Sequence, residues 1–237
     1  MRIFIITALL LLFWGSISSP YIIGQETQRQ YLSGTGSDHT VNWQFFCTEG
    51  RNSGYWTTIP VPSNWELQGF GTYNYGLDKD TLQGREKGLY KYEFSVPTNW
   101  KDKNISLVFE GSMTDTEAKI NGKSAGIKHQ GAFYCFRYDV TYLIKPGQKN
   151  ILEVTVAKHS DNKSVNKAER QGDYWIFGGI YRPVYLEAKP KQHIRRVAID
   201  AEANGHFESE VYISRVQTPL EISAQIYSSD GKKFGEP

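Results

Sequence analysis

Apolar and polar residues alternate with a period of two along the middle of the chain. From Tyr90 to Val96 every second residue is aromatic or β-branched, and the residues between them are Lys91, Glu93 and Ser95. This alternation predicts a β-strand with one buried face. The same pattern predicts strands at 105–109, 118–120, 123–127, 136–140, 151–157, 174–177 and 181–186. No window of helical length has a 3.6-residue period.

Glycine, proline and asparagine separate these runs. Asn121-Gly122 is the strongest short hairpin signal in the chain, and Lys145-Pro146-Gly147 and Gly178-Gly179 mark further breaks. Strands that recur about every 8–12 residues between such turns predict an all-β fold. We expect residues 26–190 to form an antiparallel sandwich or jelly roll.

A second series of strands begins after Lys189-Pro190-Lys191. Its alternating runs are 194–199, 207–213 and 220–226, and Asp230-Gly231 adds a hairpin signal close to the last residue. A seven-stranded immunoglobulin-like domain needs roughly 100 residues. The sequence therefore predicts a boundary near Pro190 and a partial immunoglobulin-like β-sandwich at 191–237, as in a polypeptide cut inside a domain.

The first 25 residues have the pattern of a secretory signal peptide. Met1-Arg2 is followed by an uncharged apolar run from Ile3 to Trp14 and then by the small residues of 15–19. A transmembrane anchor would need about 20 apolar residues, and a buried N-terminal helix is a further alternative. We expect cleavage between Ser19 and Gln25, export to the periplasm or medium, and no membrane attachment afterwards.

Composition narrows the possible partners and cofactors. The net charge of +2 gives no reason to expect nucleic acid or an acidic membrane surface as a partner. Cys47 and Cys135 lie in aromatic surroundings that suit buried free thiols, although a disulfide stays possible in an exported protein. Neither a CxxC motif nor a cluster of His and Cys is present, so we expect no metal and no cofactor.

No self-contained active site can be found, because the GxSxG, HExxH, P-loop and GxGxxG motifs are all absent. Aromatic residues instead flank glycine-rich or acidic turns. Flat rings beside carboxylate and amide groups suit a sugar, whose C–H face stacks while its hydroxyls form hydrogen bonds. The alternative is that these rings fill the core of the sandwich. The residues concerned are Trp65, Tyr73, Tyr75, Tyr174 and Trp175.

Five segments together resemble glycoside hydrolase family 2, the β-galactosidase and β-glucuronidase family. They occur in the family's order over about 31–190: Ile59 to Phe70 (IPVPSNWELQGF), Gly88 to Phe94 (GLYKYEF), Lys119 to Lys123 (KINGK), Phe136 to Thr141 (FRYDVT) and Gly172 to Val184 (GDYWIFGGIYRPV). The resemblance implies a galactose-binding-like jelly-roll sugar-binding domain at 26–190, an immunoglobulin-like sandwich and a TIM barrel that holds two catalytic glutamates.

By that resemblance the chain is the N-terminal portion of an exported β-galactosidase-like glycosidase that acts on a β-linked carbohydrate. Retaining hydrolysis would use two carboxyl groups roughly 5 Å apart. Both would belong to the missing C-terminal barrel of the same polypeptide, so we assign no catalytic residue here and expect the chain to be inactive alone. A stand-alone carbohydrate-binding module and a non-catalytic β-sandwich subunit of a surface assembly are the alternatives.

The resemblance also implies site residues. A loop of the sugar-binding domain would contact the sugar through Asp173, with Asn74 or Tyr75 beside it. The stretch 71–76 departs from the galactosidase pattern, which leaves the preferred sugar open. Arg182 is expected to brace the last strand of the jelly roll through an ion pair.

Overall fold

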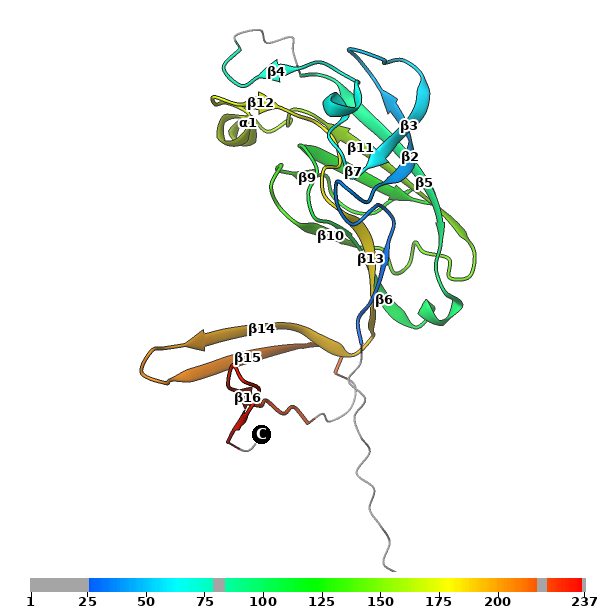
Figure 1. The fold of residues 1–237 in the computed structure, drawn as a ribbon. Helices are drawn as coiled ribbons and strands as arrows, with labels where there is room; N and C mark the ends of the chain where they lie inside the picture. The colour runs from blue at the N-terminus through cyan, green and yellow to red at the C-terminus, as the bar shows by residue number, and fades with distance from the viewer. Residues whose placement is uncertain (1–25, 79–83, 217–220, 236–237) are drawn as a thin grey trace, which may run out of the picture.

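The computed structural model describes residues 26–78, 84–216 and 221–235. The predicted signal peptide therefore lies outside the described residues. Two antiparallel sheets form a sandwich, and strands that pair across long sequence distances hold it together (Figure 1).

The smaller sheet of the sandwich has four strands in the order β1-β13-β6-β10. These are β1 (Gln28–Tyr31), β13 (Val184–Pro190), β6 (Lys103–Phe109) and β10 (Phe136–Asp139). The larger sheet has the order β3-β2-β5-β11-β7-β8, with β9 paired to β7. Its strands are β3 (Trp56–Val61), β2 (Val41–Cys47), β5 (Lys87–Ser95), β11 (Lys149–Ala157), β7 (Asp115–Ile120), β8 (Lys123–Ser124) and β9 (His129–Gln130).

The core fills the space between the two sheets. Leu152, Val154 and Val156 alternate inward along β11, and the large sheet also buries the rings of Trp43 and Phe45. The small sheet contributes the inward residues Ile105, Leu107, Phe109, Val184, Leu186 and Ala188. The predicted all-β, antiparallel sandwich is thus confirmed, since each period-two run buries one face between the sheets.

The Asn121-Gly122 turn joins β7 to β8 as predicted. Both residues have positive φ angles, 53° and 77°, which a two-residue hairpin of this type requires. The Asn121 side chain also accepts a hydrogen bond from the Ile151 amide and donates one to the Leu143 carbonyl. The turn is therefore fixed to the neighbouring strand.

Several predicted strands are shorter than expected, and one helix was not predicted. The 123–127 run is a strand only at Lys123–Ser124, and the 181–186 run becomes a strand only at Val184. The α-helix α1 (Lys163–Glu169) begins after Asn162, whose side chain accepts a hydrogen bond from the Ser164 amide. Its side chains are mostly polar, so it has no apolar stripe that periodicity could detect. Short 3₁₀ helices span Trp65–Gln68 and Thr98–Trp100.

The remaining strands form small two-stranded sheets. β14 (His193–Ala201) pairs with β15 (Phe207–Ser214), and β16 (Ile226–Tyr227) pairs with β17 (Lys233–Phe234) across the predicted Asp230-Gly231 turn. The predicted strand 220–226 is wrong over 221–225, which has no strand structure, and Leu220 lies outside the described residues. β13 ends at Pro190, and the domain boundary there stays a prediction.

The two cysteines are both free, but only one is buried. Cys47 lies in the core, and its sulfur contacts the Glu49 carbonyl at 3.1 Å. Cys135 is exposed, as are its neighbours Phe133 and Tyr134. The expectation of two buried thiols is therefore wrong for Cys135, because the aromatic residues before it lie on a surface loop. Within the described part of the chain, no helix is long and apolar enough to cross a membrane.

Adjacent positions of β11 provide a test of the core. Leu152 is fully buried, whereas the side chain of Ile151 is 43% exposed. We expect Leu152→Ala to lower the free energy of unfolding by about 2–5 kcal/mol, because it leaves a cavity between the sheets. Ile151→Ala should cost less than about 1 kcal/mol. Urea denaturation of the two variants measures the difference, and equal losses would contradict the assigned orientation of β11.

Truncation after Pro190 tests the domain boundary. Among the described residues, few polar contacts join the side chains of one part to the other part. The Asn104 side chain lies 3.4 Å from the Lys191 carbonyl, Lys191 lies 3.7 Å from Asp102, and Arg215 lies 3.4 Å from the Tyr142 hydroxyl. We expect a chain that ends at Pro190 to melt at nearly the same temperature as the longer chain. A large drop in the melting temperature would mean that 191–237 belongs to the same cooperative unit.

Candidate functional site

The structure brings together residues of the predicted site from two distant segments. β4 (Asn74–Tyr75) pairs with β12 (Trp175–Ile176), so that Tyr75 lies opposite Trp175 and Asn74 opposite Ile176. The Tyr75 hydroxyl donates a hydrogen bond to the Asp173 carboxylate. In Figure 1 this strand pair lies at one end of the sandwich, beside α1.

Asp173 and Asn74 have different environments. Asp173 is exposed on the turn before β12, where its carboxylate can reach a ligand. Asn74 is only 3% exposed, although it lines a cavity beside the strand pair. Of the three predicted residues, the structure thus places Asp173 and Tyr75 in direct contact and Asn74 one layer deeper.

Beside Asp173 lies an aromatic face, which we define as Tyr73, Tyr75, Tyr174 and Trp175. The Trp175 ring packs edge-on against Tyr75 and Tyr73, with centroids 5.4 and 5.9 Å apart, yet it is 55% exposed. The Arg51 guanidinium also lies over the Tyr73 ring, with its Cζ atom 4.8 Å from the ring centroid. Exposed rings held in place by their neighbours can stack on the C–H face of a sugar.

Trp65 does not belong to this face. It is fully buried and packs with Phe45 at a ring distance of 6.3 Å, so for this ring the alternative of a place in the core is the correct one. Gly178 lies so close to Trp65 that a Cβ atom there would be 2.0 Å from the indole ring. The glycines around Trp65 therefore let the backbone close over the ring.

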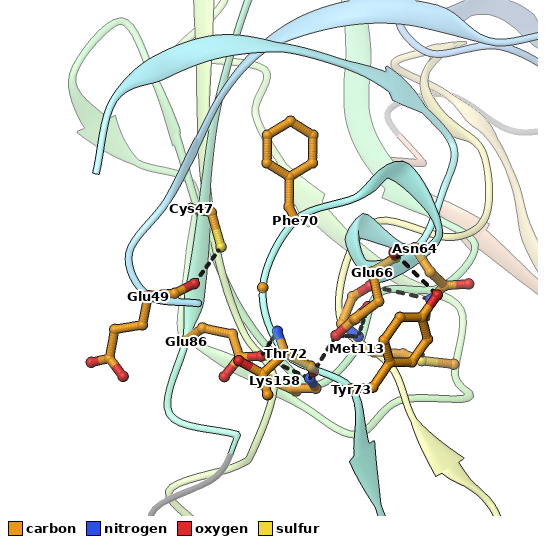
Figure 2. Close-up of polar contacts among 12 residues, drawn as sticks. Cys47, Glu49, Asn64, Glu66, Phe70, Thr72, Tyr73, Glu86, Met113 and Lys158 are labelled. Carbon is orange, nitrogen blue, oxygen red and sulfur yellow. Dashed lines mark hydrogen bonds and ion pairs between the residues drawn. The ribbon is translucent and has the colours of Figure 1, made fainter. Parts of the chain in front are cut away.

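A buried charged triad, formed by Lys158, Glu66 and Glu86, lies near Tyr73, whose hydroxyl donates to the Glu66 carbonyl at 3.3 Å (Figure 2). The Lys158 ammonium is 2.7 Å from a Glu66 oxygen and 2.8 Å from a Glu86 oxygen, and all three side chains are almost fully buried. Lys158 also donates to the Thr72 carbonyl at 2.5 Å, and the Thr72 amide donates to Glu86 at 3.0 Å. The triad thus fixes the backbone immediately before β4.

The second strand of the site is fixed by the same triad. Both oxygens of Glu66 accept a hydrogen bond from the Gly178 amide, at 3.0 and 3.1 Å, just after β12. Burial raises the pKa of Glu66 more than the attraction of Lys158 lowers it. The triad was not predicted from the sequence. One signal was present, because position 158 continues the series of buried positions 152, 154 and 156 and places a lysine where an inward-facing residue is expected.

A cavity of about 530 Å³ opens beside β4 and β12. Its walls include Tyr75, Lys87, His159 and Arg170, so it is lined by hydrogen-bonding and charged groups as well as by Ile176. Among the described residues, no cluster of His, Cys, Asp and Glu side chains could hold a metal ion.

Arg182 does not form the ion pair that was expected of it. No ion pair of Arg182 occurs within the described ranges, and its guanidinium lies over the Tyr181 ring at 5.3 Å from the centroid. Arg182 is exposed and precedes β13, which begins at Val184. The expectation failed because the strand starts later than the sequence pattern indicated.

Comparison with known proteins gives a consistent family match. The model of the sugar binding domain of glycosyl hydrolases family 2 matches residues 44–190. A beta-galactosidase of Bacteroides ovatus is 30% identical over 168 residues, which are 67% of this chain and 18% of that protein. A beta-galactosidase of Priestia megaterium is 28% identical over 166 residues, 65% of this chain and 16% of that protein.

The solved structures agree with the fold. A beta-glucuronidase of Ruminococcus gnavus superposes with a TM-score of 0.63 at 20% identity, over 87% of this chain and 36% of that chain. The chain thus spans less than a fifth of the length of the two beta-galactosidases that it resembles.

Replacing the buried ammonium tests the triad. Lys158→Met leaves two buried carboxylates without their cation, and we expect the free energy of unfolding to fall by about 3–5 kcal/mol. Lys149→Met is the matched control, because Lys149 lies at the other end of β11 in an exposed pair with Glu93 that should contribute little. Chemical denaturation compares the two variants, and a small loss for Lys158→Met would show that the triad does not support the site.

Proposed function

Because the chain belongs to glycoside hydrolase family 2, we propose that it is the N-terminal portion of an exported glycosidase that hydrolyses β-linked sugars. In this proposal the aromatic face and Asp173 form part of the sugar site. The observation that carries it is the hydrogen bond from Tyr75 to Asp173 beside the exposed Trp175 ring. Two segments 98 residues apart meet there to present a carboxylate next to a stacking surface.

Each group has a defined task in the proposed site. Trp175 offers its exposed ring to the C–H face of a sugar. The Asp173 carboxylate has acceptor capacity beyond the bond from Tyr75, so it can accept hydrogen bonds from sugar hydroxyls. The Tyr75 hydroxyl orients that carboxylate before a ligand arrives, which lowers the entropic cost of binding.

The chemical step belongs to residues outside this chain. Hydrolysis with retention requires an acid and a nucleophile, two carboxyl groups about 5 Å apart on opposite sides of the scissile bond. We place both in the C-terminal barrel that the family resemblance implies. The role of this chain is to position the sugar, and the relatives' names make a β-galactoside or a β-glucuronide the first substrates to assay.

Export is part of the same proposal. The apolar run at 3–14, flanked by a basic start and small residues, supports secretion to the periplasm or the medium. Amino-terminal sequencing of the mature protein tests it, and a mature protein that still begins at Met1 would contradict it.

The alternative is a stand-alone carbohydrate-binding module, and the same site would then bind sugar without catalysis. The exposed aromatic face is compatible with that function too. The two functions differ in one respect: a module binds its sugar with full affinity as the isolated chain, whereas the glycosidase needs the barrel to complete its site.

Asp173→Asn in the complete enzyme tests the proposed contact. We expect kcat/KM to fall by about ten- to a hundredfold, because an amide accepts hydrogen bonds from hydroxyls less strongly than a carboxylate. The melting temperature should change little, since Asp173 is exposed. Tyr75→Phe, which keeps the ring and removes the orienting hydroxyl, should cost less.

Asp102→Asn serves as the matched control for Asp173→Asn. Asp102 is also an exposed aspartate with one side-chain partner, Lys191 at 3.7 Å, but it is not part of the β4–β12 pair. Its replacement should leave the kinetics unchanged. If Asp173→Asn behaves in the same way, Asp173 has only a structural role in the turn.

A further inference from the structure

The cavity beside β4 and β12 contains a buried cation that forms no ion pair with the described residues. Arg170, at the C-terminal end of α1, is only 3% exposed and lines the cavity. Its Nε donates to the Thr114 hydroxyl at 2.5 Å, and Nη1 lies 3.8 Å from the sulfur of Met113. Nη2 has no hydrogen-bond partner among the described residues, and no ion pair of Arg170 is formed there.

Burying a guanidinium in this way is unfavourable without a compensating group. Burial lowers the pKa of Arg170 to about 10, so the side chain keeps its positive charge at neutral pH. Glu169 and Glu66 are close enough to favour that charge, but neither lies within ion-pairing distance of it. Glu169 instead accepts the Ala132 amide at 2.7 Å, and Glu66 is held by Lys158.

The cavity wall contains further charged side chains of both signs. Lys87 and Arg85 line it, are exposed, and form no ion pair within the described residues. Of the carboxylates on the wall, Asp161 pairs with Lys128 at 2.5 Å, and Asp78 accepts the Tyr75 amide at 3.1 Å. Among the described residues the wall therefore has three cations, Arg85, Lys87 and Arg170, against one carboxylate without an ion pair, Asp78.

His159 adds a neutral donor to this wall. Burial and the nearby charges of Arg170 and Lys158 lower its pKa, which keeps the imidazole uncharged at neutral pH. A neutral imidazole can still donate one N–H to an oxygen atom. The cavity therefore combines cations and a hydrogen-bond donor in a volume of about 530 Å³, within the range of sites for small ligands.

We propose that this cavity binds the anionic group of an acidic glycan, a carboxylate or a sulfate ester. Arg170 and Lys87 provide the charge, and Arg170 provides a planar donor that suits paired oxygen atoms. Tyr75 belongs both to the cavity wall and to the aromatic face. A sugar stacked on that face can thus place a charged substituent in the cavity beside it. The inference rests on the proposed function in taking the ligand to be a sugar.

Calorimetric titration of the purified protein tests the proposal with four probes. These are methyl β-D-glucuronide, the 6-sulfate of methyl β-D-glucoside, methyl β-D-glucoside itself and sodium sulfate. We expect the acidic glycosides to bind at least about tenfold more tightly than the neutral one, since charge-assisted hydrogen bonds are the stronger ones. Their affinity should also fall as salt is added, because the exposed Lys87 is screened.

Variants assign the effect to the cavity. Lys87→Gln should weaken binding of the acidic glycosides about three- to tenfold and leave the neutral glycoside unaffected. Lys145→Gln is the control, since Lys145 is also exposed but lies outside the cavity. Arg170→Lys keeps the charge and removes the planar donor, so it should also weaken binding; its melting temperature checks that the variant is folded.

Three results would overturn the proposal: equal affinity for the neutral and acidic glycosides, binding of free sulfate but of neither acidic glycoside, and unchanged affinity in Lys87→Gln together with a folded Arg170→Lys. The assay requires no turnover. A protein that binds the acidic glycosides but cleaves no glycoside would therefore contradict the proposed hydrolase while leaving this cavity assignment intact.

Discussion

A lysine ammonium and two glutamate carboxylates lie out of contact with water at one end of the sandwich. Removing three charges from solvent is costly, and the cost is offset only when each charge has close partners. Lys158 has three of them, namely Glu66, Glu86 and the Thr72 carbonyl. Lys158 directly follows β11, Glu66 lies in a 3₁₀ helix, and Glu86 directly precedes β5. The triad therefore links three separate segments of the chain.

The triad gives the exposed site its fixed geometry. β4 and β12 contain two residues each, too few for a strand pair to be stable in isolation. The Thr72 amide before β4 donates to Glu86, and the Gly178 amide after β12 donates to Glu66. These hydrogen bonds hold the short strand pair in place. A recognition surface made of turns can then be rigid, which favours binding because less ordering is required when the ligand arrives.

The sequence predicted the parts of this molecule in which local pattern and tertiary structure agree. β5 and β11 follow their alternation, and the Asn121-Gly122 hairpin follows from the backbone that its turn requires. α1 escaped prediction because it buries almost no apolar side chain. The sequence left the burial of Trp65 open, because the glycines that cover it become its neighbours only in the folded chain. The contact between Tyr75 and Asp173 depends on the pairing of β4 with β12, which no local pattern contains.

The pairing of β4 with β12 also orders events during folding. Tyr75 and Asp173 are 98 positions apart, and most strands of the sandwich lie between them in the chain. Contacts across such a separation form late, since the entropy of closing a long loop is recovered only when the intervening strands are in place. On a ribosome, the first half of the sandwich would emerge without a partner for β4. The sugar-facing surface is thus a feature of the completed domain, and its presence on a folded molecule indicates that the strands between have already docked.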